Sequence, residues 1–299
     1  MNIQDVLLPG AVVDGRYRIE SIIGQGGVAR VYKATQLDLK APVALKVVSY
    51  VSSNITLVHN LERRLIKEGR AAAKIRHPNA ICMRAIRKRM MVDVNGKRAK
   101  LDKPYIVMDC LQGHTLRHEL EQNGPLEPQR ALRHVRCALD ALWVAHEQGI
   151  VHKDLKPSNL FLTAPGTHRE ALVVLDFGVA RQGDPMTVSV SPPVTPHYAA
   201  PEYISSQKVG PAVDVYQMGL ILIEMLTGKS PVDDESPIEC LRRHVDGELE
   251  VAPWLMESPL GPLLKSATAT NPAERIAHAG IFYKVLGRIS PQDLHPVHT

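Results

Sequence analysis

The sequence predicts an α+β fold in two lobes, a small antiparallel β-sheet with one main helix followed by a mainly helical lobe. Two observations lead to this prediction. Short runs of β-branched and apolar residues fill the first third of the chain, whereas helical periodicity dominates the remainder. The length of 299 residues suits two domains, or one domain with two lobes, at about 150 residues per domain.

The small lobe is expected to consist of strands around one helix. Alternation and β-branching predict strands at residues 17–23, 28–35, 43–48, 81–86 and 105–108. The glycine-rich run 24–27 forms the turn between the first two strands. Residues 61–75 have helical composition and stop before His77-Pro78. Asn95-Gly96 predicts a hairpin turn.

The large lobe is expected to begin where strand character ends, near residues 109–113. Apolar residues recur at helical spacing over 128–148. Residues 213–226 are almost continuously apolar, which predicts a helix buried on all sides. His114 and His118 stand four apart on an expected helix, where a solvated face is favoured over a metal site.

The composition excludes several classes of protein. With 44% hydrophobic and 22% charged residues, the chain is typical of a globular protein. No apolar run approaches the ~20 residues of a membrane helix, and the N-terminus lacks the basic region of a signal peptide. The four cysteines are far apart, so we expect free thiols in a reducing compartment. These features predict a cytoplasmic protein, or the cytosolic domain of a longer one.

Positive charge is concentrated in one segment. Residues 84–103 hold eight Lys or Arg and two Asp, a net charge of +6, whereas the whole chain carries +5. A nucleic-acid-binding protein would spread basic residues over a face, so no nucleic-acid partner is expected. The segment predicts a long solvated hairpin, dispensable for chemistry, and the alternative is a docking surface for an acidic partner.

A glycine-rich loop lies between the first two expected strands, with the sequence Gly-Gln-Gly-Gly-Val-Ala-Arg-Val from Gly24 to Val31. No helix follows it, which excludes the dinucleotide-binding fingerprint. A strand–turn–strand of this kind can bring backbone N–H groups close to a polyphosphate. The alternative is an ordinary glycine hairpin.

One lysine stands in an apolar strand. In Val-Ala-Leu-Lys at 43–46, Ala44 and Lys46 share one face because side chains alternate along a strand. A lysine on a buried strand needs an anionic partner, and Glu68 on the following helix is the candidate. The alternative is an edge-strand lysine that points to solvent.

The strongest pattern is His-Lys-Asp-Leu-Lys-Pro-Ser-Asn at 152–159, followed by Asp-Phe-Gly at 176–178. Asp154 can act as a base, and Asn159 and Asp176 offer two oxygen ligands. Mg²⁺ prefers such hard oxygen ligands and keeps water or phosphate in its other positions. The order and spacing of these motifs together indicate one catalytic site.

These motifs resemble the protein kinase family, and most of all the eukaryotic-type Ser/Thr protein kinases of bacteria. The resemblance implies the two-lobed protein kinase fold over residues 14–290, with lobes at about 14–109 and 113–290. Residues 1–13 are then an N-terminal extension and residues 291–299 a tail. The implied cofactors are ATP and Mg²⁺, with Mn²⁺ as an alternative.

The resemblance also implies roles for individual residues. The glycine-rich loop covers the ATP phosphates, and Lys46 holds the α- and β-phosphates while it pairs with Glu68. Backbone groups of Asp109 and Leu111 bind the adenine, with Met108 as gatekeeper. The implied nucleotide-binding residues are Ile23, Gly24, Gln25, Gly26, Gly27, Val28, Ala29, Arg30, Val31, Ala44, Lys46, Glu68, Met108, Asp109, Leu111 and Phe161.

Catalysis is assigned in the same way. Asp154 orients the substrate hydroxyl and accepts its proton, Lys156 steadies the γ-phosphate, and Asn159 and Asp176 hold the metal ion. Residues 195–202, Thr-Pro-His-Tyr-Ala-Ala-Pro-Glu, resemble the end of an activation segment.

Two further residues of the large lobe have structural roles by the same resemblance. Glu202 is expected to form a buried ion pair with Arg275. Asp214 is expected to cap the helix over 213–226 and to tie down the catalytic loop.

The implied function is transfer of the ATP γ-phosphate to serine and threonine hydroxyls of protein substrates, with autophosphorylation. Lys156, two residues after Asp154, is typical of Ser/Thr kinases. The alternatives are a pseudokinase or ATP-binding scaffold, and a small-molecule kinase. The complete set of catalytic positions disfavours the first, and the Asp-Phe-Gly and Ala-Pro-Glu segments disfavour the second.

Three positions depart from the family pattern: Ala29 replaces a loop glycine, Val194 precedes Thr-Pro, and Lys153 precedes Asp154. Lysine cannot copy the bidentate contact of an arginine with a phosphorylated loop. We therefore expect phosphorylation between residues 178 and 195 to switch the enzyme only weakly.

Overall fold

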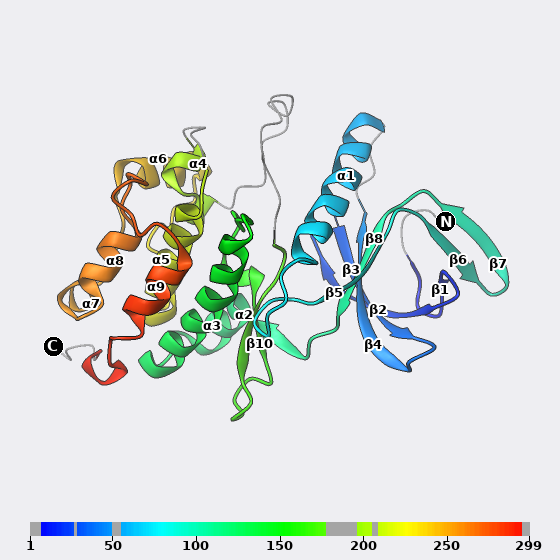
Figure 1. Cartoon of the computed structure of the whole chain (residues 1–299), viewed down its shortest axis with the longest axis horizontal. Helices are drawn as coiled ribbons and strands as arrows, with labels where there is room; N and C mark the ends of the chain where they lie inside the picture. Colours follow the sequence, from blue (N-terminus) through cyan, green and yellow to red (C-terminus); the bar gives the residue numbers. More distant parts are fainter. Residues whose placement is uncertain (1–6, 27–28, 50–54, 178–195, 205–208, 295–299) are drawn as a thin grey trace. The chain divides into compact units, whose positions relative to one another are not determined.

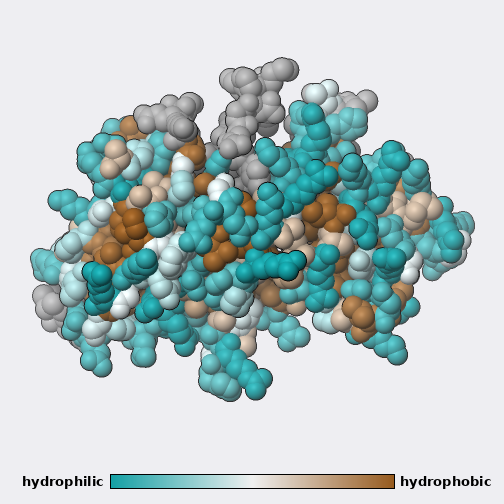
Figure 2. Space-filling view, in the orientation of Figure 1, coloured by the Kyte–Doolittle hydropathy of each residue, from teal (hydrophilic) through white to brown (hydrophobic). Residues whose placement is uncertain are grey.

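The computed structural model describes residues 7–26, 29–49, 55–177, 196–204 and 209–294 (Figure 1). The chain divides into two compact units. The N-terminal unit comprises Met1–Arg76 and Ile81–Leu111, and the C-terminal unit comprises His77–Ala80 and Gln112–Thr299. Among the described residues, no helix combines the length and the apolar character needed to cross a membrane. Much of the face in Figure 2 is hydrophilic, with apolar residues in smaller patches.

The N-terminal unit is built on an antiparallel sheet with the strand order β5-β8-β4-β3-β2-β1-β6-β7. Its strands are β1 (Val12–Val13), β2 (Tyr17–Gln25), β3 (Ala29–Gln36), β4 (Ala41–Val48), β5 (Met83–Arg87), β6 (Met90–Val94), β7 (Lys97–Leu101) and β8 (Tyr105–Asp109). The strands predicted at 17–23, 43–48, 81–86 and 105–108 are thus confirmed within a few residues. The short strand β1 was not predicted, and β6 and β7 were predicted only as the two arms of a hairpin around Asn95-Gly96.

One helix, α1 (Ile55–Ala72), packs against β4, β5 and β8. It lies very close to the sheet at Gly69, where an added Cβ would be 2.8 Å from Ile106 Cδ1. The prediction of a helix over 61–75 was right in kind and wrong in its limits. The helix ends earlier because Ile75 N–H bonds the Ala72 carbonyl in a tight turn that buries the Ile75 side chain.

The prediction of a solvated hairpin over residues 84–103 is wrong in part. Asn95 and Gly96 do form a turn, with φ of 52° and 82°. However, Met90 and Val92 of β6 are only 1% and 2% exposed and belong to the core of the sheet. Met90 and Val92 face inward, whereas Met91 between them is exposed, as are the basic residues Lys97, Arg98 and Lys100 of β7.

The C-terminal unit is mainly helical, as predicted. Its helices are α2 (Leu116–Asn123), α3 (Pro128–Glu147), α4 (Pro201–Ile204), α5 (Ala212–Thr227), α6 (Pro237–Asp246), α7 (Pro253–Glu257), α8 (Gly261–Ala267) and α9 (Ala279–Leu286), with 3₁₀ turns η1 (Pro157–Asn159), η2 (Pro196–Tyr198) and η3 (Pro291–Asp293). A small sheet has the order β11-β10-β9, from β9 (Gly113–Thr115), β10 (Leu160–Thr163) and β11 (Ala171–Val174).

Helix α5 is the centre of this unit. Every residue from Val213 to Leu226 is buried, which confirms the prediction of a helix covered on all sides. It packs against α3, α8 and α9. A helix so enclosed can bring polar groups into the interior only where each one finds a hydrogen-bond partner.

The placement of His114 and His118 on one helix is wrong. His114 lies in β9 and only His118 lies in α2. Their rings are in edge-to-face contact with centroids 5.0 Å apart, and His114 Nε2 lies 2.5 Å from Glu119 Oε2. Gly113 explains the strand, because a Cβ there would be 1.9 Å from the Leu162 carbonyl oxygen of β10.

The predicted ion pair between Glu202 and Arg275 is confirmed. Arg275 donates through both terminal nitrogens to the Glu202 carboxylate, at 2.7 and 3.0 Å, and the side chains are 0% and 2% exposed for Arg275 and Glu202. Arg275 also donates to the carbonyls of Ala212, Ala269 and Thr270. The pair thereby joins α4, the start of α5 and the loop before α9.

We predict that Glu202→Ala lowers the free energy of unfolding of the C-terminal unit by about 3–5 kcal/mol, because Arg275 stays buried without its counter-charge. Chemical denaturation of the parent and the variant measures this change. Glu239→Ala is the matched control, since its pair with Arg242 is exposed, and it is expected to cost less than about 1 kcal/mol. Equal losses in the two variants would contradict the prediction.

Candidate active site

The loop between α3 and β10 is held by a buried carboxylate of α5. Asp214 is 0% exposed. It accepts hydrogen bonds from His152 N–H at 2.8 Å, from Lys153 N–H at 2.7 Å and from His146 Nε2 at 2.8 Å. Burial opposes ionisation, but these hydrogen bonds outweigh it, and the pKa of Asp214 lies below its ordinary value. The prediction that Asp214 ties down the loop is confirmed.

The capping part of that prediction is wrong. The residue at the N-cap of α5 is Pro211, and Asp214 stands in the first turn. Its carboxylate accepts hydrogen bonds from backbone amides of the loop instead of capping the amides of its own helix. Gln217, one turn further along α5, adds a second support, because it accepts from Leu155 N–H at 3.0 Å and donates to the Lys153 carbonyl at 3.3 Å.

His152 links this loop to the end of β11. Asp154 N–H donates to His152 Nδ1 at 3.3 Å, so Nε2 carries the proton and donates to the Leu175 carbonyl at 2.7 Å. The ring also contacts Phe177 edge to face, with centroids 5.2 Å apart. The two motifs that the sequence separates by about twenty residues therefore meet at one histidine.

The predicted catalytic residues lie together in this loop. Lys156 Nζ is 3.1 Å from Asp154 Oδ2. Asn159 Nδ2 donates to the Asp154 carbonyl oxygen at 2.7 Å and to Oδ2 at 3.2 Å. The Asp154 side chain is 42% exposed, so its carboxylate is oriented by two neighbours and still accessible to a substrate.

Asp176 is brought beside Asn159 by strand pairing. Leu160 faces Val174 across β10 and β11, and Leu175 N–H donates to the Asn159 carbonyl at 2.8 Å. Because Leu175 is bonded to Asn159, the next residue along the chain, Asp176, lies beside Asn159. Lys153 and Asp176 have φ of 69° and 45°, a left-handed backbone that costs about 1–3 kcal/mol per residue and often occurs at functional sites.

This donor set fits a hard divalent cation that shares its coordination with phosphate. Asn159 Nδ2 is engaged by Asp154, which leaves the amide oxygen for a cation, and Asp176 supplies a carboxylate. Within the described ranges no three His, Cys, Asp or Glu side chains gather into a metal-binding group. A site with so few protein oxygens suits a divalent cation that keeps water and phosphate ligands.

The glycine-rich loop lies in the N-terminal unit between β2 and β3. Gly24 faces Val31 and Gln25 faces Arg30 across the two strands, and Gly26 N–H donates to the Ala29 carbonyl at 2.9 Å. Ile23 is 51% exposed. Gly27 and Val28, also predicted to bind the nucleotide, lie outside the described residues.

Lys46 stands on the face of the sheet that carries α1. Across the strands it faces Val31 and Ile106, and Ile106 packs with Val48 and with Leu65 of α1. Glu68 follows Leu65 by three residues and so lies on the same side of α1. Its carboxylate accepts from Arg64 Nε at 3.2 Å. The predicted pairing of Lys46 with Glu68 stays a prediction, which this shared face supports.

The residues predicted to bind adenine end strand β8. Met108 faces Ala44 of the neighbouring strand β4, and both residues are buried. Asp109 N–H donates to the Cys82 carbonyl at 3.1 Å, and its carboxylate accepts from Arg84 Nε at 2.6 Å. Leu111 is half-buried.

Gln217 and His146 support the candidate site, and Phe161 lies in the neighbouring strand β10. Gln217 and His146 were not predicted, because their only signal is a polar residue within a helical apolar pattern. His146 Nδ1 accepts from Ala279 N–H at 3.2 Å, which fixes its ring while Nε2 binds Asp214. Phe161, predicted to bind the nucleotide, is half-buried in β10 between Thr115 and Val173.

The segment after the candidate site re-enters the described residues at Pro196. Tyr198 is buried, and its hydroxyl contacts both Arg117 of α2, at 2.6 Å, and Glu224 of α5. Thr195, Val194 and the rest of the segment 178–195, where phosphorylation is expected, lie outside the described residues.

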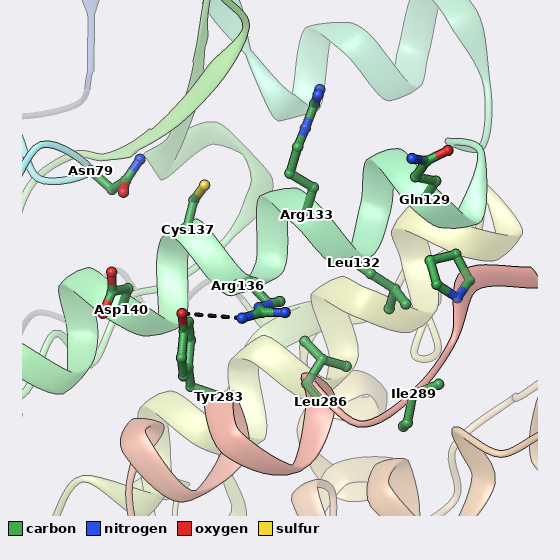
Figure 3. Close-up of a pocket in the computed structure, with 11 residues that line it drawn as sticks. Asn79, Gln129, Leu132, Arg133, Arg136, Cys137, Asp140, Tyr283, Leu286 and Ile289 are labelled. Carbon is green, nitrogen blue, oxygen red and sulfur yellow. Dashed lines mark hydrogen bonds between the residues drawn. The ribbon is translucent and has the colours of Figure 1, made fainter.

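A separate pocket lies between α3 and α9 (Figure 3). It has a volume of about 380 Å³ and includes Leu132, Arg136 and Tyr283 in its lining. Arg136 turns toward Tyr283, donating to its hydroxyl at 3.2 Å. None of the residues predicted for catalysis or nucleotide binding lines it.

Comparison with known proteins identifies the family. The protein kinase domain model matches residues 17–283. Serine/threonine-protein kinase PrkC of Bacillus subtilis is 32% identical over 275 residues, 90% of this chain. PknL of Mycobacterium tuberculosis is 30% identical over 277 residues, 91% of this chain, and PknB of the same species is 31% identical over 269 residues, 87% of this chain.

The chain therefore belongs to the protein kinase domain family, and the resemblance drawn from the motifs is confirmed. Within that family it is similar to bacterial serine/threonine protein kinases. Members of this family use ATP and a divalent metal ion. The chain spans 40% of the length of PrkC and of PknB, and 65% of that of PknL.

A solved structure confirms the fold. The crystal structure of the PknI kinase domain from Mycobacterium tuberculosis matches with a TM-score of 0.67 and 23% sequence identity, covering 95% of this chain and 99% of that chain. The expected α+β architecture, with a sheet-containing first lobe and a helical second lobe, is thus the protein kinase fold.

The stability of the C-terminal unit is also expected to respond to pH through His244 of α6. Burial lowers the pKa of His244 from 6.5 to about 4, and its Nδ1 lies 2.8 Å from the Tyr216 hydroxyl. The pKa of His244 is lower in the folded than in the unfolded protein. The contribution of the neutral His244 to stability is therefore fully present above the unfolded pKa of 6.5 and is lost as the pH falls toward 4.

We predict that, between pH 7 and pH 4, the free energy of unfolding of the parent falls by about 3 kcal/mol more than that of His244→Gln. Glutamine can bond Tyr216 but does not titrate in this range. Denaturation at a series of pH values measures the difference, and all other titrations cancel between the two proteins. Parallel stability curves would exclude this role of His244.

Proposed function

We propose that this domain transfers the γ-phosphate of ATP to serine and threonine hydroxyls of proteins. The observation that carries the proposal is the cluster of Asp154, Lys156 and Asn159 in a loop fixed by Asp214, with Asp176 beside it. The names of the bacterial relatives support the substrate class. Incubation with labelled ATP, Mg²⁺ and an unstructured protein substrate, followed by phosphosite mapping, tests it.

Asp154 acts as the base. Its exposed carboxylate accepts the proton of the substrate hydroxyl as the hydroxyl oxygen attacks the γ-phosphorus. The bond from the γ-phosphorus to the bridging oxygen breaks, and ADP leaves with that oxygen. Lys156, held 3.1 Å from Asp154, places a positive charge where negative charge on the transferred group must be stabilised.

Asn159 and Asp176 are the residues that would hold the metal ion. When bound, a divalent ion neutralises charge on the phosphates. We propose Mg²⁺, with Mn²⁺ as the alternative, because the donors are an amide oxygen and a carboxylate. The left-handed backbone at Asp176 turns the chain at the end of β11 and sets the direction of this carboxylate.

The nucleotide is proposed to use the N-terminal unit. The loop from Gly24 to Val31 covers the phosphates, and Lys46 binds the α- and β-phosphates. At the end of β8 the N–H of Asp109 is already bonded to Cys82, so its carbonyl is the group offered to adenine, together with the N–H of Leu111.

Autophosphorylation belongs to the same proposal, and Lys153 limits its effect. A lysine offers a point charge in place of a bidentate clamp, so a phosphorylated loop is expected to be held only weakly. An ATP-binding scaffold remains the alternative function. It would bind ATP and release no phosphorylated product in the labelling experiment.

We also propose an acidic protein partner for the basic segment 84–103. Its net charge of +6 is offset in part by the pairs of Arg84 with Asp109, Arg89 with Asp102 and Arg98 with Asp93. Only the first of these pairs draws its carboxylate from outside the segment, so most of the positive charge remains.

Asp154→Asn is predicted to lower kcat by at least about 10²-fold with little change in ATP affinity, because the base acts in the chemical step. Steady-state kinetics and calorimetric ATP titration measure the two quantities. Ser158→Ala, an exposed change in the same loop, is the control and is expected to keep normal kcat. A large loss of ATP binding would instead assign Asp154 to the metal site.

Asp176→Ala is predicted to remove the gain in ATP affinity that Mg²⁺ gives the parent protein, since the carboxylate ligand is lost. Calorimetry with and without Mg²⁺ measures this gain. Asp140→Ala, a carboxylate change in α3, serves as control and retains the Mg²⁺ dependence. If the parent binds ATP equally well without Mg²⁺, the assignment is wrong.

A further inference from the structure

The N-terminal sheet ends in an unusual strand. In the order of strands, β7 is terminal and pairs only with β6 among the described residues, as Figure 1 shows at one end of the sheet. A terminal strand presents a row of backbone N–H and C=O groups that can pair with another chain. Which groups these are follows from the hairpin turn.

The turn fixes the direction of each backbone group in β7. Asn95 and Gly96 both have positive φ, the signature of a two-residue type I′ turn, in which Val94 and Lys97 form a hydrogen-bonded pair. Antiparallel pairs alternate between bonded and non-bonded. Arg98 and Lys100 are therefore in non-bonded pairs, and their N–H and C=O groups point outward.

Contacts on the other side of the hairpin agree with this assignment. Met91 is opposite Lys100. Its N–H donates to Asp14 Oδ1 at 2.7 Å, and its carbonyl accepts from Asp14 N–H at 2.7 Å. Since Met91 uses both backbone groups toward β1, it makes no bond with Lys100, and the groups of Lys100 are directed away from β6.

The side chains of β7 have two distinct faces. Arg98 and Lys100 lie on one face and are exposed. Ala99 and Leu101 lie on the other, where Leu101 packs against the sheet core. A strand added at this edge would place alternate residues beside two cations and the residues between them beside apolar groups.

We propose that β7 binds an extended acidic segment of a partner protein as an additional antiparallel strand, with acidic residues alternating with apolar ones. This deepens the acidic partner proposed above and is independent of phosphoryl transfer. Charge complementarity selects this occupant. A second copy of β7 would bring Lys97, Arg98 and Lys100 against the same cations, and such like-charge pairs are destabilising.

Peptides with modified backbones test the proposal on the full chain. The probe is a fluorescent nine-residue peptide of alternating Glu and Val, measured by anisotropy at low salt. In the proposed pairing a Glu lies opposite Arg98 and Lys100, and the Glu nitrogens donate to β7. N-methylation of the Glu nitrogens should weaken binding by at least about tenfold, since two or more hydrogen bonds are lost. N-methylation of the Val nitrogens, which point away, should change it less than about threefold.

Two variants of the protein provide the complementary test. Lys100→Pro removes the outward N–H together with the charge, and an edge strand tolerates proline at such a position. Lys100→Ala removes the charge alone and is the matched control. Lys100→Pro should bind the parent peptide several-fold more weakly than Lys100→Ala. Circular dichroism and activity on a short neutral peptide should be unchanged in both.

The outcomes separate the two proposals. Equal binding of the two methylated peptides would overturn strand addition and leave an acidic partner held by charge alone. Equal affinity of Lys100→Pro and Lys100→Ala would overturn strand addition as well. Failure of the parent peptide to bind at about 1 mM, an affinity of roughly −4 kcal/mol, would overturn both proposals and leave the lysines as protection against edge-to-edge aggregation.

Discussion

The geometry of the candidate active site depends on one buried carboxylate, Asp214. A charge inside an apolar helix is costly unless hydrogen bonds satisfy it. Here the loop amides of His152 and Lys153, with His146, supply those bonds. The requirement works in both directions, because the loop amides would otherwise lack acceptors in the interior. Asp154, which follows Lys153, is therefore held in position by the hydrogen bonds that the buried Asp214 carboxylate requires. Rigid support of this kind is what an oriented catalytic base requires.

Regular patterns made much of this architecture predictable. Strand β4 and helices α3 and α5 follow from β-branching, helical period and continuous apolarity, because each pattern reports directly on which faces are buried. The pairing of Glu202 with Arg275 was predicted from the motifs that contain these residues and not from their spacing. The residues proposed for catalysis were predicted in the same way, from motifs with fixed residue types at fixed intervals.

The remainder depends on contacts between distant parts of the chain that no local pattern encodes. Gln217 of α5 bonds the loop directly, whereas His146 of α3 bonds Asp214. In the sequence each is only a polar residue on an apolar background. The burial of β6 was hidden for a different reason. In β6 only Met90 and Val92 are fully buried, and the surrounding cations dominate the composition. The two-residue strand β1, together with Asp14, fixes the register of this hairpin, and a strand of two residues leaves no periodicity to detect.

The ion pair of Glu202 with Arg275 has a consequence for synthesis of the chain. Its partners are 73 residues apart, and Arg275 lies close to the end of the kinase domain match at residue 283. Chains emerge from the ribosome at about 5–20 residues per second, so α4 and the start of α5 remain without this anchor for several seconds after they are translated. A nascent chain carries every residue of the catalytic cluster well before the clamp on the neighbouring segment can close. The order of translation thus separates the appearance of the proposed catalytic residues from the completion of the unit that supports them.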